Sequence, residues 1–152
     1  YHDVVILNYH RVLSTALAMG HPVPAALKDK LLRLFELDIN IICPDGRYPD
    51  LNDGSRASLA YWCGIGLRYF PDHPVIRYFA TEGREGHPPA YTSVALPYAG
   101  LAFMRTDWGR DDLWCFMDAG DFGRGAGRLP ANRLQREMDL CEPGADAGDY
   151  HP

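Results

Sequence analysis

The densest group of reactive side chains in the sequence is a set of carboxylates near its middle. Asp45, Asp50 and Asp53 lie close together in a stretch rich in Pro, Asn and Gly. Paired carboxylates supply the acid and the base of a glycoside hydrolase. Asp-Gly and Asn-Asp-Gly are also the ordinary chemistry of tight turns and helix caps. We therefore expect a structural role, with Asp53 as a cap, and keep a glycoside hydrolase as an alternative.

The other reactive groups indicate neither a metal nor a cofactor. The four cysteines are far apart and form no C-x-x-C pair, so buried free thiols are the expected state rather than a zinc site or a disulfide framework. The glycine-rich segment 123–127 has no strand-to-helix context, so it does not predict a phosphate site. The cysteines are Cys43, Cys63, Cys115 and Cys141.

Composition excludes several classes of protein. The chain has 152 residues, of which 47% are hydrophobic and 23% charged, so wholesale disorder is excluded. Its net charge of -5 argues against a nucleic-acid-binding surface over the whole chain. No apolar run approaches the roughly 20 residues of a membrane-spanning helix. We therefore expect no nucleic-acid partner and no membrane insertion.

The hydrophobic periodicity changes along the chain. Apolar residues at helical spacing predict helices over 3–19, 24–42, 55–70 and 75–81. From about Tyr91 the period approaches two and predicts short strands over 92–96, 99–106 and 113–118, with a hairpin turn at 109–112. Helices followed by strands are typical of an α+β arrangement.

Two residues of the predicted strand region are candidates for binding. Arg105 lies among apolar neighbours, where a charge is costly unless it is paired, so we expect it to hold loops together. Trp62 and Trp114 have the spacing of core residues. Trp108 adjoins the predicted turn, and we expect it to be an exposed platform for a sugar ring.

Four short motifs in order resemble the heparinase II/III-like polysaccharide lyases. The first is a helix that opens with Tyr-His and ends at Gly20. The match is spread over about residues 1–123. The other motifs are Pro44-Asp45-Gly46-Arg47-Tyr48-Pro49 with Asn52-Asp53-Gly54-Ser55, Leu96-Pro97-Tyr98-Ala99-Gly100 leading to Met104-Arg105-Thr106 and Trp108, and Asp118-Ala119-Gly120.

The resemblance implies an architecture and a reaction. Residues 1–90 would be the last helices of an (α/α) toroid, and residues 91–152 the start of an antiparallel β-sandwich. Such enzymes cleave uronic-acid-containing glycans by β-elimination, so the expected partner is an acidic polysaccharide. By analogy the protein would be periplasmic or secreted, although this chain contains no signal peptide. We expect the chain to be an internal fragment that is inactive by itself.

The resemblance also implies site residues. Tyr1 would be the catalytic tyrosine and His2 the histidine beside it, whereas the family's asparagine would lie upstream. His10 follows two helical turns later and is a candidate for substrate binding together with Arg105 and Trp108, although a core role is the more common one for such a histidine. The family's H-x-H-x-D turn is expected near 124–134, and this sequence has no histidine there. That departure keeps a non-catalytic carbohydrate-binding or scaffold protein open as a second alternative.

Overall fold

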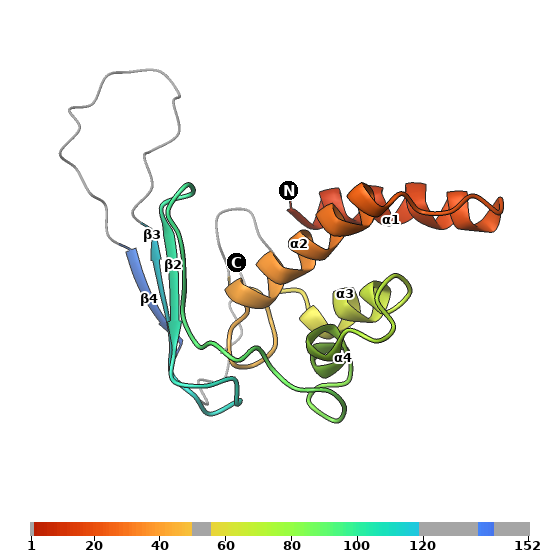
Figure 1. Cartoon of the computed structure of the whole chain (residues 1–152). Helices are drawn as coiled ribbons and strands as arrows, with labels where there is room; N and C mark the ends of the chain where they lie inside the picture. The colour runs from red at the N-terminus through yellow and green to blue at the C-terminus, as the bar shows by residue number, and fades with distance from the viewer. Residues whose placement is uncertain (1, 50–55, 119–136, 142–152) are drawn as a thin grey trace, which may run out of the picture. The chain divides into compact units, whose positions relative to one another are not determined.

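The computed structural model describes residues 2–49, 56–118 and the backbone of strand 137–141 (Figure 1). The chain divides into two compact units. Unit 1 is Tyr1–Ile42 with Gly46–Pro88, and unit 2 is Cys43–Asp45 with Pro89–Pro152. Helices make up the regular structure of unit 1 and strands that of unit 2, so the predicted α+β class is confirmed. No helix in the described ranges is long and apolar enough to cross a membrane.

Unit 1 contains four helices, each of which packs against the next (Figure 1). Two long helices are followed by two short ones, and the third is shorter than the predicted span of 55–70. Pro24 stands just before the second helix and Pro74 is the first residue of the fourth, positions where a missing N–H leaves no helical hydrogen bond unmade. The helices are α1 (His2–Ala18), α2 (Ala25–Ile41), α3 (Leu59–Gly66) and α4 (Pro74–Ala80).

The core of unit 1 uses a narrower stripe of α1 than the sequence suggests. Only Ile6 and Leu13 of this helix are buried. Among the described residues α1 packs mainly along α2, which covers one face of it. The apolar residues of α1 that are exposed are Val4, Val5, Val12 and Leu17. The other core side chains include Leu31, Phe35, Ile39, Leu59, Trp62, Cys63 and Ile76.

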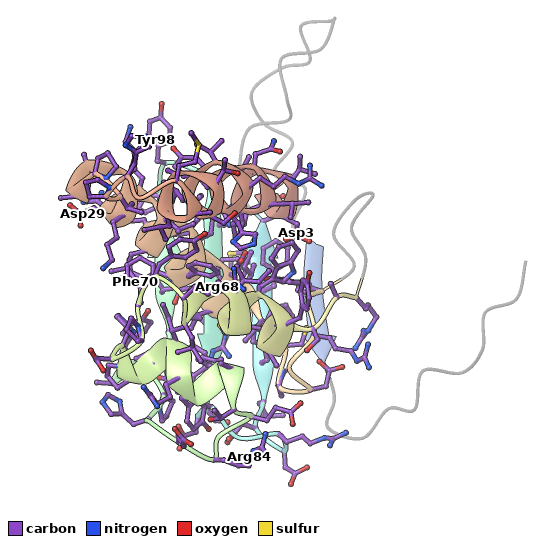
Figure 2. All side chains as sticks on the ribbon, turned by 90° about the vertical axis from the view of Figure 1, so that its right-hand side faces the viewer. Asp3, Asp29, Arg68, Phe70, Arg84 and Tyr98 are labelled. Carbon is purple, nitrogen blue, oxygen red and sulfur yellow. The ribbon has the colours of Figure 1, made fainter. Side chains whose placement is uncertain are left out.

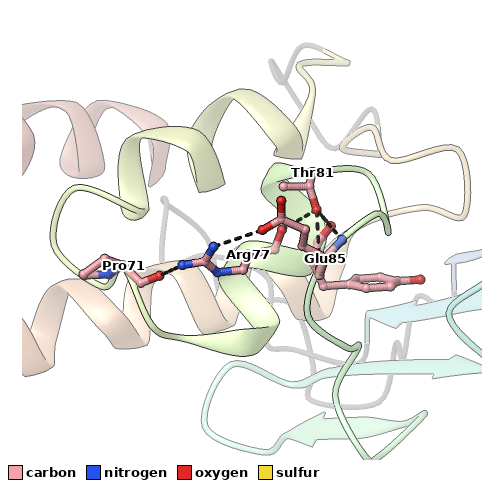
Figure 3. Close-up of polar contacts among 5 residues, drawn as sticks. Pro71, Arg77, Thr81 and Glu85 are labelled. Atoms are coloured by element: carbon pink, nitrogen blue, oxygen red, sulfur yellow. Dashed lines mark hydrogen bonds and ion pairs between the residues drawn. The ribbon is translucent and has the colours of Figure 1, made fainter.

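The segment after α4 folds back on that helix (Figure 3). Arg77 forms an ion pair with Glu85 at 3.0 Å and donates a second hydrogen bond to the carbonyl of Pro71. The Thr81 hydroxyl accepts from the backbone N–H of Glu85 at 3.0 Å. Gly86 has a φ of +78° and lies against the Pro74 carbonyl, so closely that a Cβ would overlap that oxygen. The segment after α4 is therefore anchored to this helix by Glu85 and Gly86.

Unit 2 contains a four-stranded antiparallel sheet in the order β1-β2-β3-β4. Arg105 pairs with Trp114 and Phe103 with Phe116 in the β2–β3 register, which places these four residues on one face. All four are buried. The strands are β1 (Val94–Leu96), β2 (Leu101–Arg105), β3 (Trp114–Asp118) and β4 (Glu137–Cys141).

The predicted hairpin between β2 and β3 is confirmed. Asp112 accepts from the Thr106 hydroxyl at 2.9 Å and from the Gly109 N–H at 2.7 Å. The Thr106 hydroxyl in turn accepts from the Leu113 N–H at 3.0 Å. The fourth strand was not predicted, although polar and apolar residues alternate over Glu137, Met138, Asp139 and Leu140.

Candidate functional site

The first helix begins with a histidine whose ring is held by the second helix. His2 Nε2 lies 3.1 Å from the carbonyl oxygen of Leu34 and 3.1 Å from Oδ1 of Asp38. Both partners are acceptors, so Nε2 must carry a proton. The ring is thereby fixed in one orientation at the N-terminal end of α1.

Asp38 is fully buried although it is a carboxylate. Its exposed fraction is 0%, and neither oxygen has a hydrogen bond of good geometry within the described residues. It lies on the face of α2 that also carries Leu31 and Phe35, since these residues precede it by seven and three positions. A buried carboxylate is costly unless it is paired. The ring of His2, with 27% of its side chain exposed, is the partner that the geometry provides.

Tyr48 reaches the same place from the loop after α2. Gly46 has a φ of +76°, a conformation open to glycine, and its carbonyl accepts from the Leu59 N–H at 3.1 Å. The Tyr48 N–H donates to the carbonyl of Ala57 at 3.1 Å. These bonds tie the Pro-Asp-Gly turn to the start of α3 and turn the Tyr48 ring into the interior, where it is 7% exposed.

The charges of this cluster explain its pKa values. Burial of the ring lowers the pKa of His2, but Asp38, the Leu34 carbonyl and Asp3 together outweigh it, so the pKa is raised above its ordinary value. Burial raises the pKa of Asp38, and His2 and Tyr48 offset only part of that rise. The surroundings of His2 therefore favour its protonated form, beside a carboxyl group that has no exposure to water.

The two remaining groups of the cluster stay neutral. Burial, with Asp38 as the next cause, raises the pKa of the Tyr48 hydroxyl far above its ordinary value and does the same to the Cys63 thiol. Neither side chain can therefore act as an anionic base or nucleophile near neutral pH. We name the group His2, Asp3, Asp38, Tyr48 and Cys63 the His2–Asp38 cluster.

His10 lies further along α1 in a separate contact. Its Nδ1 is 2.9 Å from the Tyr69 hydroxyl, and the rings meet edge to face. Burial lowers the pKa of His10, and the nearby charge of Arg68, labelled in Figure 2, lowers it further. His10 is half-buried and favours the neutral form, which suits a hydrogen-bonding residue better than an anion-binding one.

In unit 2, Arg105 and Trp108 form a stacked pair. The guanidinium lies 3.8 Å from the Trp108 ring centroid, and the indole N–H donates to the carbonyl of Tyr91 at 2.8 Å. Burial lowers the pKa of Arg105 to about 10, so the group remains charged at neutral pH. Arg105 thus holds two loop segments of this unit, as expected for a buried cation.

The expectation that Trp108 is an exposed platform is wrong. Its exposed fraction is 9%, and Arg105 covers its ring. Proximity to a turn suggested exposure, but the stacking cation and the hydrogen bond to Tyr91 draw the indole inward. Trp62 and Trp114 are buried, as predicted.

The remaining sequence candidates are only partly described. Asp45 is exposed, and Cys43 and Cys63 are buried thiols outside any disulfide, as expected. Within the described ranges no three His, Cys, Asp or Glu side chains gather closely enough to hold a metal ion. Tyr1, Asp50, Asp53 and segment 124–134 lie outside the described residues.

Sequence reasoning missed Asp38 and Tyr48. The signal for Asp38 was present, because it is the acidic residue that interrupts the apolar stripe Leu31, Phe35, Ile39 and Ile42. A charge on the buried face of a helix predicts a buried partner. For Tyr48 the only signal was its place within the Pro-Asp-Gly motif.

Comparison with known proteins gives a consistent group of lyases. The chain is 34% identical over 80 residues to a heparin-sulfate lyase of Pedobacter heparinus, a match that covers 48% of this chain. It is 26% identical over 125 residues to a heparin-sulfate lyase of Bacteroides stercoris, which covers 79% of this chain. No family model matches the chain.

Solved structures of the same kind of lyase are also similar to the chain. A heparinase III gene product superimposes with a TM-score of 0.74 at 26% identity over 81% of this chain. The crystal structure of a heparan sulfate lyase from Pedobacter heparinus superimposes with a TM-score of 0.72 at 24% identity, which supports the fold. The chain spans 12% and 19% of the two curated relatives and 20% of each solved chain.

Proposed function

We propose that the protein carrying this chain is a polysaccharide lyase. The proposal is supported by the curated relatives and the solved structures, which relate part of the chain to heparinase-type lyases. It would cleave uronic-acid-containing glycans, with heparan sulfate as the first substrate to test. Residues 1–90 would form the last helices of an (α/α) toroid and residues 91–152 the start of a β-sandwich. A periplasmic or secreted location is part of the same proposal.

The proposed reaction is a β-elimination. A base removes the proton at C5, which is acidified by the neighbouring carboxylate of the uronate. The bond between C4 and the bridging oxygen breaks, a C4–C5 double bond forms, and the leaving oxygen takes up a proton. Donors must hold the substrate carboxylate, because its charge grows in the transition state.

Tyr1 is the proposed base and acid. Its phenolate accepts the C5 proton, and the resulting phenol returns a proton to the leaving oxygen. An unperturbed tyrosine has a pKa of about 10, so a neighbouring cation is needed to populate the phenolate near neutral pH. The observation that carries the proposal is that the ring of His2, the next residue, lies 3.1 Å from the buried carboxyl group of Asp38, which raises the His2 pKa and favours such a cation.

The proposed binding residues have different tasks. His10, which favours the neutral form, would donate to or accept from sugar hydroxyls. Arg105 supplies positive charge suited to sulfate or carboxylate groups, and Trp108 supports it by stacking rather than by offering a free ring face. These roles predict that His10→Ala and Arg105→Ala mainly raise KM.

A non-catalytic glycan-binding protein is the second candidate. The specific observation in its favour is the absence of histidine from 124–134, where the resemblance places a histidine-rich turn. Binding of heparan sulfate by the intact protein without turnover would establish this candidate. The 152 residues alone are proposed to be inactive in either case.

Digestion of a panel of acidic glycans tests the proposal. The intact protein should give products whose C4–C5 double bond absorbs ultraviolet light, and a Tyr1→Phe variant should not. Saturated products would show hydrolysis instead, and Asp50→Asn and Asp53→Asn would then identify a hydrolase by abolishing turnover.

A further inference from the structure

The proposed reaction does not by itself explain why Asp38 is buried. The carboxylate is 0% exposed, lies inside unit 1, and cannot reach a bulky glycan directly. Its Oδ1 atom faces His2 Nε2 at 3.1 Å. An isolated carboxylate in this position would be protonated or replaced by an apolar residue, since desolvation disfavours the charged form. The side chain therefore acts through the ring it contacts.

We propose that Asp38 is a positioning residue, which fixes the His2 ring through Nε2 and favours the protonated form of that ring. This inference rests on the proposed function, because it assigns His2 to the activation of Tyr1. Because Nε2 is engaged by Asp38 and by the Leu34 carbonyl, Nδ1 is the ring nitrogen that would donate to the substrate carboxylate.

Of the charges around His2, all except that of the α1 dipole favour the protonated ring. Asp38 raises the His2 pKa, and so does Asp3, which is labelled in Figure 2. Tyr48 and Cys63 face Asp38 and stay neutral. The positive end of the α1 dipole opposes a cation at the first turn. Two nearby carboxylates, one of them desolvated, outweigh that partial charge.

A purely structural role is the alternative for the pair. The contact ties the start of α1 to the last turns of α2, and that tie alone would explain its presence. The two roles differ in what they change. If the contact is only structural, replacing Asp38 changes the stability alone. If Asp38 positions His2, replacing it also changes the pKa of His2 and the pH dependence of turnover.

The test uses the intact protein with Asp38→Asn, Asp38→Glu and the matched control Asp29→Asn, whose carboxylate is exposed on the same helix. Nuclear magnetic resonance of labelled histidine rings, with His2 assigned by a His2→Gln variant, gives the His2 pKa. Formation of unsaturated product against pH gives kcat and KM. In the wild type the His2 pKa should lie above about 6.5.

Asp38→Asn should lower the His2 pKa, reduce kcat at least about tenfold with KM changed less than about twofold, and shift the pH profile. Asp38→Glu should retain a raised His2 pKa, and Asp29→Asn should match the wild type. An unchanged His2 pKa in folded Asp38→Asn overturns the inference, as does a lowered pKa with an unchanged pH profile. If Asp38→Asn does not fold, a wild-type His2 pKa at or below about 6.5 overturns it and a raised one supports it.

Failure of the proposed function gives a different pattern. The wild type would then yield no unsaturated product, while the His2 pKa would still depend on Asp38. If the wild type gives unsaturated product and Asp38→Asn has the same pH profile as the wild type, the proposed function stands and only the inference about Asp38 is wrong.

Discussion

His2 and Asp38 join two helices through a single ring nitrogen. Nε2 of His2 lies 3.1 Å from Oδ1 of Asp38 and 3.1 Å from the carbonyl of Leu34, one helical turn earlier on α2. The His2 ring, in the first turn of α1, therefore contacts two successive turns of α2. Because one partner is a fully buried carboxylate, both the position and the charge of the ring depend on it.

Stability should fall as pH rises through the His2 pKa. The folded-state pKa of His2 is raised, so the stability it contributes is fully present below the unfolded value of about 6.5 and is lost as pH rises through the folded value. The free energy of unfolding, measured by urea denaturation, should therefore be lower at about pH 8.5 than at about pH 6. The pKa of Asp38 is also raised in the folded state, so titration of this group also lowers the stability as pH rises, but at lower pH than His2.

Two variants check the source of this effect. In Asp38→Asn the loss of stability between the two pH values should shrink, and in His21→Gln, which removes an exposed histidine, it should persist. An equally large loss in Asp38→Asn would assign the pH dependence to other groups.

Arg105 should stabilise unit 2 through its flat, stacked guanidinium. Arg105→Lys keeps the charge but loses the planar contact with Trp108, and we expect a cost of about 1–2 kcal/mol in the free energy of unfolding. Arg110→Lys, at an exposed site in the adjacent turn, is the control and should change stability by less than about 0.5 kcal/mol. A loss in Arg110→Lys as large as that in Arg105→Lys would contradict the stacking account.

Gly86 should not tolerate a side chain. Gly86→Ala places a Cβ against the Pro74 carbonyl at a φ of +78°, so both overlap and backbone strain oppose it, and we expect a cost above about 2 kcal/mol. Gly64→Ala is the matched control, because this glycine lies in α3 with nothing within 4 Å of its Cβ position. Since alanine favours helix, Gly64→Ala should raise the melting temperature. The same response to both substitutions would show that the 81–86 segment is not anchored as described.

Asp112 should hold the β2–β3 hairpin together. Asp112→Ala removes the acceptor of the Thr106 hydroxyl and of the Gly109 N–H, and we expect a loss of about 1–2 kcal/mol in a urea titration. Asp111→Ala removes an exposed neighbouring carboxylate and should be close to neutral. Equal midpoints for the two variants would mean that the turn does not depend on the Asp112 contacts.

The regular part of the fold could be predicted from local patterns. The helices α1 and α2 are indicated by apolar spacing and by Gly20 and Pro24 between them, and β2 and β3 by alternation around a turn. The buried side of α1 could not be predicted, since every face of this helix carries valine or leucine and only Ile6 and Leu13 are buried. The alternation of polar and apolar residues in β4 was missed, and its pairing with β3 is a long-range contact that the local sequence does not indicate.

The site was predictable only in part. Resemblance placed His2 at a site, but the carboxylate that sets its charge is 36 positions later, and only the folded chain brings Asp38 to it. Trp108 was misjudged because a turn position does not reveal that a buried arginine stacks on the ring. Both errors concern tertiary contacts of polar groups, which hydrophobic periodicity does not encode.

The most direct test of the central claim is the ultraviolet absorbance of glycan digests made by the intact protein and by its Tyr1→Phe variant at equal concentrations. The account predicts unsaturated products from the wild type and a rate at least about 100-fold lower from Tyr1→Phe, the usual size of a lost acid–base group. Saturated products from the wild type, or an unchanged rate in Tyr1→Phe, would contradict it.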